Sequence, residues 1–539
     1  MICGAVLVVV ILSLLKRRRD VTRKLAQLRN DWGKIPANAM DIESARILFE
    51  CNIPDSPDHS YTVDKDTWAD LDFDDIYALI NRTTTPTGAQ YLFHLLKHPT
   101  VEKGVLEDRE RLIDRFSVDQ DLREQVQRAI RGLGDMNAKY LPYLLWKSLP
   151  DRPSYAKYLP VLSAGSILAL LLVVFGFLHF TILIGVFLVN LAIRFYVKRR
   201  IDIFLYSFQY LGILIGAARK LSSLKDDEIA SVRSTLKSNL EGTRIIEKIV
   251  LALQFEDSLG VMEYLNIYFL WDVSGFYSAI NRIKRHVEEL RNLYNMVGYL
   301  DAMIAVASFR MDHDTFCRPS FTADAKRYRV NGAYNPLLRD PVPNSFEFDT
   351  PDYIVTGSNM AGKTTFIKTM AVNAILSQTI NTCMAKKYEG PLVRVISSMV
   401  REDNLLLGKS YFMAEVESIL RLIRASESDV THLFLLDEIF RGTNSVERHA
   451  VSIEVLRYLA NKKDFVLVAT HDLKLSETLS DEYQNIHFQE EVGEEGLAFD
   501  YKLHPGSSTT RNAIALLKHV GYPASITRNA TNRVNDAGT

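Results

Sequence analysis

The sequence predicts an all-α N-terminal region that carries transmembrane helices, followed by an α/β domain of the P-loop type. Three observations predict this division. Apolar residues recur at spacings of three and four through residues 20–150 and 200–312, which is typical of helices. From about residue 325, short β-type runs alternate with helical patterns. Between the two helical stretches, residues 159–193 carry no formal charge.

Composition narrows the class of protein. The 539 residues suggest roughly three to four domain-sized units, and 47% hydrophobic with 24% charged residues is ordinary for a globular chain with some membrane contribution. The net charge of −1 excludes a globally basic surface, so any contact with nucleic acid must use a local patch. The four cysteines are far apart in the sequence and form no CxxC pair, which argues against a zinc site or a disulfide framework and fits a reducing compartment.

The uncharged run Leu159–Ile193 is longer than the roughly 20 residues that one membrane span needs. We expect a hairpin of two short passes over residues 159–197, with its turn at Gly176–His179. Lys157 precedes the run and Lys198–Arg200 follow it, so the positive-inside rule places both flanks in the cytoplasm. A hairpin buried inside the protein is the alternative.

A second apolar stretch, Ile2–Leu15, is followed by the basic run Lys16–Arg19. A secretory signal carries its positive charge before the apolar run, so the reversed order favours an anchor with its N-terminus outside. Both membrane features together predict a protein of the cell (inner) membrane whose large polar regions, including the α/β domain, lie in the cytoplasm.

The segment from Gly357 to Thr364, Gly-Ser-Asn-Met-Ala-Gly-Lys-Thr, has the pattern of a nucleotide-binding P-loop. It follows the apolar run Tyr353–Thr356 and opens a helical pattern, which is the setting such a loop requires. Glycines let backbone N–H groups point at phosphate oxygens, Lys363 would reach the outer phosphates, and Thr364 would offer its hydroxyl to Mg²⁺. A chance match is the alternative. The candidate ATP-binding residues are Gly357, Ser358, Asn359, Met360, Ala361, Gly362, Lys363, Thr364 and Thr365.

Two further elements complete the chemistry of a phosphoryl-transfer site. An apolar run ends in Asp437 and Glu438, where Asp437 would hold Mg²⁺ together with Thr364, and Glu438 would orient or deprotonate the attacking water. His471 directly follows the next apolar run and could sense the γ-phosphate, since ligands collect at the carboxyl edge of parallel sheets. Carboxylates that only cap the next helix, and a purely structural histidine, are the alternatives.

These ordered motifs resemble the MutS family of DNA mismatch repair ATPases, whose nucleotide domain is of the ABC type. The matching segments are residues 357–365, Asp-Glu-Ile-Phe-Arg-Gly-Thr-Asn-Ser at 437–445, and Ala-Thr-His at 469–471. Residues 410–415 look like the family's signature segment, whose serine, here Ser410, completes the ATP site of the partner subunit. The resemblance therefore implies ATP and Mg²⁺ as cofactors, a homodimer, and DNA as a partner.

The likeness extends over roughly residues 70–525. Residues 80–88 and 300–309 look like the start and the return of the family's helical lever domain, and the end of the domain looks like its helical dimerisation segment. Three residues depart from the family pattern, Ser358, Ala361 and Phe440, which stand for a proline and two glycines. Ala361 fits the loop only if its φ stays negative. The residues before 70 are too few to form a mismatch-reading domain.

The expected organisation has seven parts. These are an anchor at 1–19, a helical linker at 20–69, the first part of the helical core at 70–158, the transmembrane hairpin at 159–197, the second part of the core and lever at 198–324, the ATPase domain with its dimerisation segment at 325–525, and a polar tail at 526–539 that we expect to fray.

Two functions remain open. The first is a membrane-anchored MutS-like ATPase that engages DNA, with Arg282, Lys284, Arg285 and His286 as candidate phosphate contacts. The same four residues could equally form a solvated helix face. The second function is a membrane-tethered mechanochemical ATPase that moves a partner protein without recognising DNA.

Overall fold

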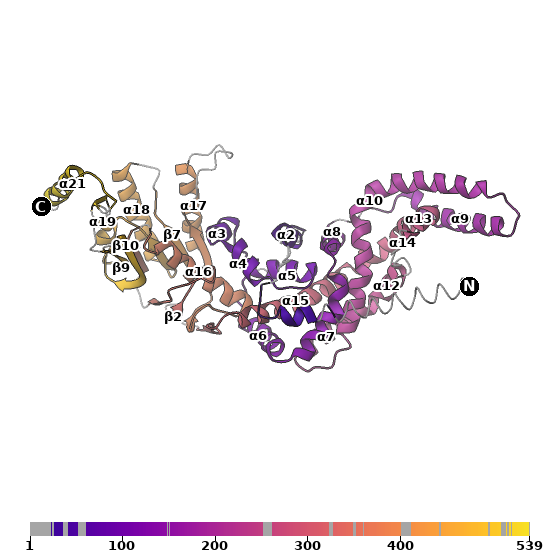
Figure 1. Ribbon diagram of the computed structural model, residues 1–539, viewed down its shortest axis with the longest axis horizontal. Helices are drawn as coiled ribbons and strands as arrows, with labels where there is room; N and C mark the ends of the chain where they lie inside the picture. The colour runs from indigo at the N-terminus through magenta and orange to yellow at the C-terminus, as the bar shows by residue number, and fades with distance from the viewer. Residues whose placement is uncertain are drawn as a thin grey trace. The chain divides into compact units, whose positions relative to one another are not determined.

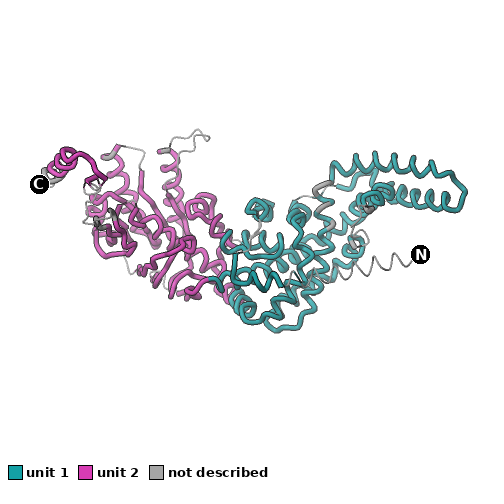
Figure 2. Tube along the Cα trace, viewed as in Figure 1, with its two compact units in different colours: residues 1–56, 78–95, 109–312 teal, residues 57–77, 96–108, 313–539 magenta. Residues whose placement is uncertain are grey.

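The fold is taken from a computed structural model of the whole chain. It divides into two compact units (Figure 2), a helical unit of residues 1–56, 78–95 and 109–312 and an α/β unit of residues 57–77, 96–108 and 313–539. The residues that the structure describes are 23, 26–35, 41–51, 61–147, 149, 151–251, 261–322, 327–348, 352–358, 360–399, 411–440, 444–493, 496–507, 514, 517–518 and 520–537.

The first 312 residues form helices throughout the described ranges, which confirms the helical prediction for this half (Figure 1). The predicted anchor at residues 1–19 lies outside those ranges. The helices are α2 (Ile42–Cys51), α3 (Lys65–Asp70), α4 (Phe73–Ile80), α5 (Pro86–Lys97), α6 (Lys103–Val118), α7 (Gln120–Ile130), α8 (Leu141–Trp146), α9 (Leu159–Val174), α10 (Thr181–Leu221), α11 (Ala230–Leu240), α12 (Arg244–Leu251), α13 (Val261–Phe269), α14 (Trp271–Arg285) and α15 (Val287–Met311), with short 3₁₀ turns at Arg131–Leu133, Met136–Tyr140, Ser154–Lys157 and Glu241–Thr243.

Near the end of the helical pattern predicted for residues 200–312, the chain forms two successive helices, α14 and α15. At His286 the backbone leaves the helical region, with φ at −116° and ψ at 26°, and its N–H donates to the carbonyls of Arg282 and Ile283 to close α14. Apolar spacing continues across this break, which is why the sequence pattern does not reveal it. The second helix, α15, is buried along nearly its whole C-terminal half.

A buried carboxylate joins α15 to the start of α5. Asp301 is fully buried and accepts hydrogen bonds from the backbone N–H and hydroxyl groups of Thr84 and Thr85, at 2.7 to 3.1 Å. Burial raises the pKa of Asp301 to about 6, although these hydrogen bonds act in the opposite direction. The Thr85 hydroxyl in turn accepts from the N–H of Gly88, so it caps α5. The pair of threonines therefore fixes where α5 begins against α15.

The predicted hairpin is formed by α9 and α10, which are joined by a turn at residues 175–180. The residues expected to form the turn, Gly176–His179, lie within it. By length and composition, the helical stretches Ser154–Val174 and Thr181–Ile201 could each cross a membrane. The boundary expected at residue 197 does not interrupt the structure, because α10 continues as one helix of 41 residues to Leu221.

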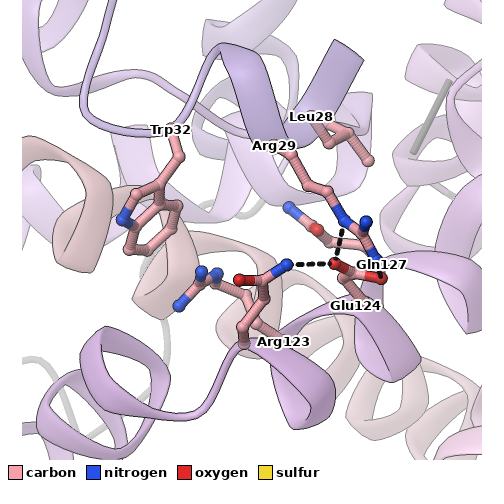
Figure 3. Close-up of a pocket in the computed structure, with 7 residues that line it drawn as sticks. Leu28, Arg29, Trp32, Arg123, Glu124 and Gln127 are labelled. Carbon is pink, nitrogen blue, oxygen red and sulfur yellow. Dashed lines mark hydrogen bonds and ion pairs between the residues drawn. The ribbon is translucent and has the colours of Figure 1, made fainter. Parts of the chain in front are cut away.

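An N-terminal segment packs on α7 (Figure 3). Arg29, within the helical turn at residues 26–30, forms a two-pronged ion pair with Glu124 at 2.6 and 3.0 Å. This hydrogen bonding lowers the pKa of Glu124 to about 2. Beside it, the Arg123 guanidinium lies 3.7 Å from the centre of the Trp32 ring. The small pocket between these side chains is thus bordered by charges that already have partners.

Mixed sheets and helices make up the α/β unit, which confirms the predicted α/β class for this part of the chain. A four-stranded sheet has the order β1-β5-β2-β3, and a six-stranded sheet the order β10-β9-β4-β8-β7-β6. The elements are β1 (Ser320–Phe321), β2 (Tyr328–Ala333), β3 (Asn344–Phe348), β4 (Asp352–Thr356), α16 (Lys363–Ile380), β5 (Lys387–Gly390), β6 (Arg394–Ser398), α17 (Tyr411–Ser426), β7 (His432–Asp437), α18 (Ser445–Ala460), β8 (Phe465–Ala469), α19 (Leu473–Thr478), β9 (Tyr483–Gly493), β10 (Gly496–Pro505) and α21 (Ala524–Ala537).

Two features of this unit differ from expectation. The polar tail at 526–539 contains regular structure that we did not expect, because α21 spans most of it and Thr527 is buried. The widely spaced Cys317 and Cys383 lie opposite each other in an isolated antiparallel bridge, with reciprocal backbone hydrogen bonds of 2.9 Å. A hydrogen bond with the Cys383 thiol lowers the pKa of Cys317, and the two cysteines form no disulfide bond.

Substituting Gly88 by alanine should destabilise the helical unit. A Cβ at this position would lie 2.3 Å from the Asp301 carboxylate oxygen, so the buried threonine–aspartate cluster would have to shift. We expect a loss of about 1–3 kcal/mol, the usual cost of overpacking a core. The matched control is Gly216→Ala on α10, where a Cβ meets nothing within 4 Å and should add up to about 1 kcal/mol of helix stability. Thermal unfolding followed by circular dichroism measures both, and equal melting temperatures would contradict the packing role of Gly88.

Candidate functional site

The candidate site is built by three adjacent parallel strands of the six-stranded sheet. β8 pairs with β4 on one side and β7 on the other, so that Ala469 lies opposite both Val355 and Asp437. All three strands are fully or almost fully buried, as expected for strands covered by helices on both faces. Because the strands run in the same direction, the segments that follow them gather at one edge of the sheet.

A buried carboxyl group holds the opposite end of β4. The Asp352 side chain accepts a hydrogen bond of 2.9 Å from the N–H of Val466 at the start of β8. Burial raises the pKa of Asp352 to about 8, so the neutral carboxyl form is favoured at pH 7. This contact ties β4 to β8 at one end, while the parallel ladder ties them along their length.

The loop after β4 requires its glycines. Gly357 has φ at 137°, and a Cβ there would lie 2.9 Å from the carbonyl oxygen of Phe488. Gly362 has φ at 107° and forms the N-terminal cap of α16. Ala361 is not among the residues with positive φ, so the condition for alanine in this position is met. Asn359 lies outside the described residues.

Lys363 lies folded back over this loop. Its side chain is almost fully buried, and its Nζ donates to the carbonyl oxygens of Gly357 at 2.7 Å and Ser358 at 2.8 Å. The Ser358 hydroxyl is also buried and has no hydrogen-bond partner among the described residues. The first turn of α16 starts here, so the N–H groups at the start of the helix lie close to a buried ammonium group.

A hydrogen bond links this loop to the end of β7. The Thr364 hydroxyl donates to the Asp437 carboxylate at 2.8 Å. A hydroxyl and a carboxylate oxygen at this distance are the hard oxygen ligands that Mg²⁺ takes beside phosphate oxygens and water. The two residues expected to hold the metal are therefore adjacent, and their donor set fits Mg²⁺.

Glu438 and His471 form the second pair at this edge. The His471 Nδ1 atom lies 2.7 Å from the Glu438 carboxylate, whose side chain is 4% exposed, whereas that of His471 is 54% exposed. The Glu438 N–H donates to the carbonyl of Ala469, which holds the residue beside β8. The geometry thus pairs a buried carboxylate with a histidine that reaches solvent.

The backbone after β7 is strained. Glu438 and Phe440 both have positive φ, 56° and 58°, a conformation that non-glycine residues seldom adopt. Phe440 stands where the resembling family has a glycine, and its positive φ supplies the physical reason for that glycine. Its ring is nearly buried and packs in the hydrophobic core of the sheet, which offsets the strain.

The structure adds residues that the sequence motifs do not mark. Arg448 and Ser452 of α18 line a small pocket together with Glu438 and His471. The Tyr501 ring on β10 borders the P-loop, because a Cβ at Gly362 would lie 3.5 Å from it. The sequence offered one indication of Arg448 and Ser452: they belong to the helix that follows Asp437–Glu438, and the first turns of that helix must lie near the end of the strand. Tyr501 has no local signal, because β9 and β10 bring it back from a distant part of the sequence.

Ser410, the predicted signature serine, lies outside the described residues. The basic residues Arg282, Lys284 and Arg285 belong to the helical unit, at the C-terminal end of α14. Their side chains have local partners: Lys284 pairs with Asp151 at 2.9 Å, and both arginines donate to carbonyls one turn earlier.

Comparison with known proteins agrees with this geometry. Residues 353–537 match the family described as MutS domain V. The chain is 29% identical over 259 residues to the DNA mismatch repair protein MutS of Thermus thermophilus, 31% over 264 residues to that of Lactobacillus acidophilus, and 26% over 261 residues to that of Natronomonas pharaonis.

These alignments cover 46–47% of this chain and only 30–31% of each relative. The similarity is therefore limited to the C-terminal half of this chain, and most of each relative's length is unmatched. For that half of the chain, the match to domain V and the similarity to MutS proteins together support membership of the MutS family.

Proposed function

We propose that this protein is a membrane-anchored, MutS-like ATPase that binds and hydrolyses ATP at sites shared between two copies and engages DNA. One observation carries the ATPase proposal: the P-loop, Asp437 and the Glu438–His471 pair meet at the carboxyl edge of three in-register parallel strands. The similarity to proteins named DNA mismatch repair protein MutS supports the DNA part.

Phosphate binding would use groups that already converge. The N–H groups at the start of α16 and the Ser358 hydroxyl would donate to phosphate oxygens. The Lys363 ammonium would exchange its two carbonyl partners for the outer phosphates, which are stronger acceptors. The Lys363 side chain thus holds the loop in shape, and the same side chain would bind the phosphates of ATP.

Hydrolysis would depend on positioning and on charge. Mg²⁺, held by Thr364 and Asp437, would neutralise the charge that develops on the phosphate oxygens. Glu438 would orient the attacking water and accept its proton, and burial keeps this carboxylate away from competing bulk water. His471 would hold the Glu438 carboxylate in one orientation. Because its side chain reaches solvent, it would also link changes at the γ-phosphate to the protein surface.

The membrane part of the proposal comes from the hairpin. Its two helices are apolar and mostly exposed, and basic residues stand at both of its ends. We infer attachment to the cell (inner) membrane with the α/β unit in the cytoplasm. Dimer formation with Ser410 acting on the partner's nucleotide is inferred from the family resemblance.

A second candidate, a mechanochemical ATPase that acts on a protein partner without DNA, is favoured by one observation. α10 runs without interruption from the hairpin turn into the helical core. A continuous helix transmits movement along its axis, so lever movements would reach the membrane directly. In that case the movement driven by ATP would act on the membrane, which would be more than a site of attachment.

The substitution Lys363→Ala should weaken ATP binding by about tenfold or more, because a buried charged hydrogen-bond donor to phosphate is lost. Binding of a fluorescent ATP analogue to the purified protein measures this. The matched control is Lys368→Ala on the same helix, which removes a surface contact with Asp72 and should leave affinity unchanged. Equal affinities of Lys363→Ala and the wild type would refute the P-loop assignment.

The substitution Glu438→Gln should preserve ATP binding but slow hydrolysis by about a hundredfold or more, the usual contribution of a general base. ATP-bound protein should then accumulate as a dimer, which light scattering in detergent can detect. Glu477→Gln, at an exposed position on α19, is the control and should turn over normally. Wild-type turnover in the Glu438 variant would show that another group orients the water.

Duplex DNA should stimulate ATP hydrolysis, and binding should weaken steeply with salt because several phosphates are neutralised. The rate is measured without DNA and with matched, mismatched and branched DNA. Replacing Arg282, Lys284 and Arg285 by alanine should reduce the salt dependence, whereas Lys225→Ala serves as a basic control elsewhere on the helical unit. Absence of both stimulation and salt-sensitive binding would favour the protein-partner function.

A further inference from the structure

The end of the hairpin is apolar where a membrane-crossing hairpin would need a polar loop. Large apolar side chains at the turn are mostly exposed: Val174 is 69% exposed, Phe175 71%, Phe177 77% and Phe180 59%. The turn, residues 175–180, contains no charged residue. A loop that emerges on the far side of a bilayer would place these phenylalanines in water.

The first four residues of the turn pair their backbone N–H groups internally. The N–H groups of Phe175, Gly176, Phe177 and Leu178 all donate to carbonyls of the last turn of α9, at 2.8 to 3.2 Å. Gly176 makes this possible with φ at 79°. The His179 ring nitrogen is paired with the Thr181 hydroxyl at 3.0 Å. Internal pairing of this kind is what hydrocarbon demands of any backbone placed in it.

Polar groups mark the base of the hairpin. The Arg194 side chain is 8% exposed and pairs with Asp272 at 2.8 Å and with Glu263 at 2.7 Å. The Glu263 side chain is 56% exposed, so its carboxylate needs water or lipid headgroups around it. One turn nearer the tip, Asn190 donates to the carbonyl of Tyr268, which fixes α13 against α10. Between Asn190 and the tip of the hairpin, α10 contains no charged residue.

Two tyrosines lie at the same base, one on each arm. Tyr158 directly precedes α9 and Tyr196 follows Arg194 on α10, and they are 56% and 55% exposed. Lys157 lies 5.0 Å from the first ring, and Arg200 lies 4.6 Å from the second. Exposed tyrosine beside basic side chains is the arrangement found where a protein meets lipid headgroups. The base of the hairpin has this arrangement of tyrosines and basic residues, and the turn at residues 175–180 does not.

The uncharged parts of the arms are shorter than the hydrocarbon core of a bilayer, and only the longer stretches Ser154–Val174 and Thr181–Ile201, which include flanking polar residues, have the length to cross it. α9 has 16 residues, and the uncharged part of α10 runs from Thr181 to Ile193, so the arms rise about 24 Å and about 20 Å. The hydrocarbon core of a bilayer is about 30 Å thick. The stretch of α10 that is long enough to cross a bilayer is Thr181–Ile201. It has that length only because it includes Arg194 and the basic residues after it.

We propose that the hairpin enters a single leaflet of a bilayer and turns back inside the hydrocarbon, so that the hairpin is monotopic and exposes none of its residues on the far side. This inference rests on the membrane attachment proposed above. The Arg194 ion pairs and the two tyrosines would lie at the headgroup level, and the phenylalanine tip would lie in the bilayer interior. Anchoring then costs no translocation of polar chain across the membrane.

The depth of the tip can be tested with a thiol placed at its most exposed residue. The full-length Phe177→Cys protein is added to preformed vesicles of equal parts phosphatidylcholine and phosphatidylglycerol. A membrane-impermeant maleimide is supplied either outside or trapped in the lumen, and labelling is read at each cysteine by peptide mass spectrometry. Lys157→Cys at the base is the matched control and should be labelled from outside.

The proposal expects the protein to float with the vesicles while the Phe177→Cys thiol reacts from neither side. Its rate should be about tenfold or more below that in detergent, because the reactive thiolate does not form in hydrocarbon. Labelling from the lumen would show a spanning hairpin and overturn the proposal while attachment stands. Labelling from outside would show a tip in water and also overturn it. A protein that does not float at all would overturn both this proposal and the membrane attachment on which it rests.

Discussion

In-register parallel pairing of β4, β8 and β7 is the constraint on which the candidate site depends. Each strand contributes one polar segment, and these segments meet only because Val355, Ala469 and Asp437 lie at the same level. A slip of one residue would turn every side chain of a strand to the opposite face of the sheet. Continuous apolar sequence suits these strands because helices cover both faces. The chemistry of the edge is therefore set by packing in the interior.

The sequence predicts the site best where a motif is contiguous. The loop glycines, Lys363 and Thr364 belong to one local conformation, so their spacing alone predicts a phosphate-binding loop. Asp437 and His471 are predictable as ends of apolar strands, but their distance from the loop is a property of the sheet order. Arg448 has only an indirect signal, the helix that follows Asp437–Glu438, and Tyr501 reaches this edge through a distant hairpin.

The fold shows the same division between local and tertiary signals. Helical periodicity and buried strand runs predict the element types in both units. The break at His286 is invisible to periodicity, because apolar spacing continues across a single non-helical residue. The helix α21 was missed because its sequence is polar, with only a narrow buried stripe that includes Thr527. Cys317 and Cys383 meet across an isolated bridge, and no spacing rule links residues so far apart.

The unbroken length of α10 has a consequence for how two copies meet. One helix of 41 residues connects the apolar arm to the helical core. If the arm is held in a bilayer, the core stays next to the membrane and moves within its plane. Encounters between copies then become two-dimensional and share one orientation, which raises the effective concentration of each for the other. Weak affinity between α/β units would suffice for pairing under those conditions, and the same units released into detergent would separate on dilution.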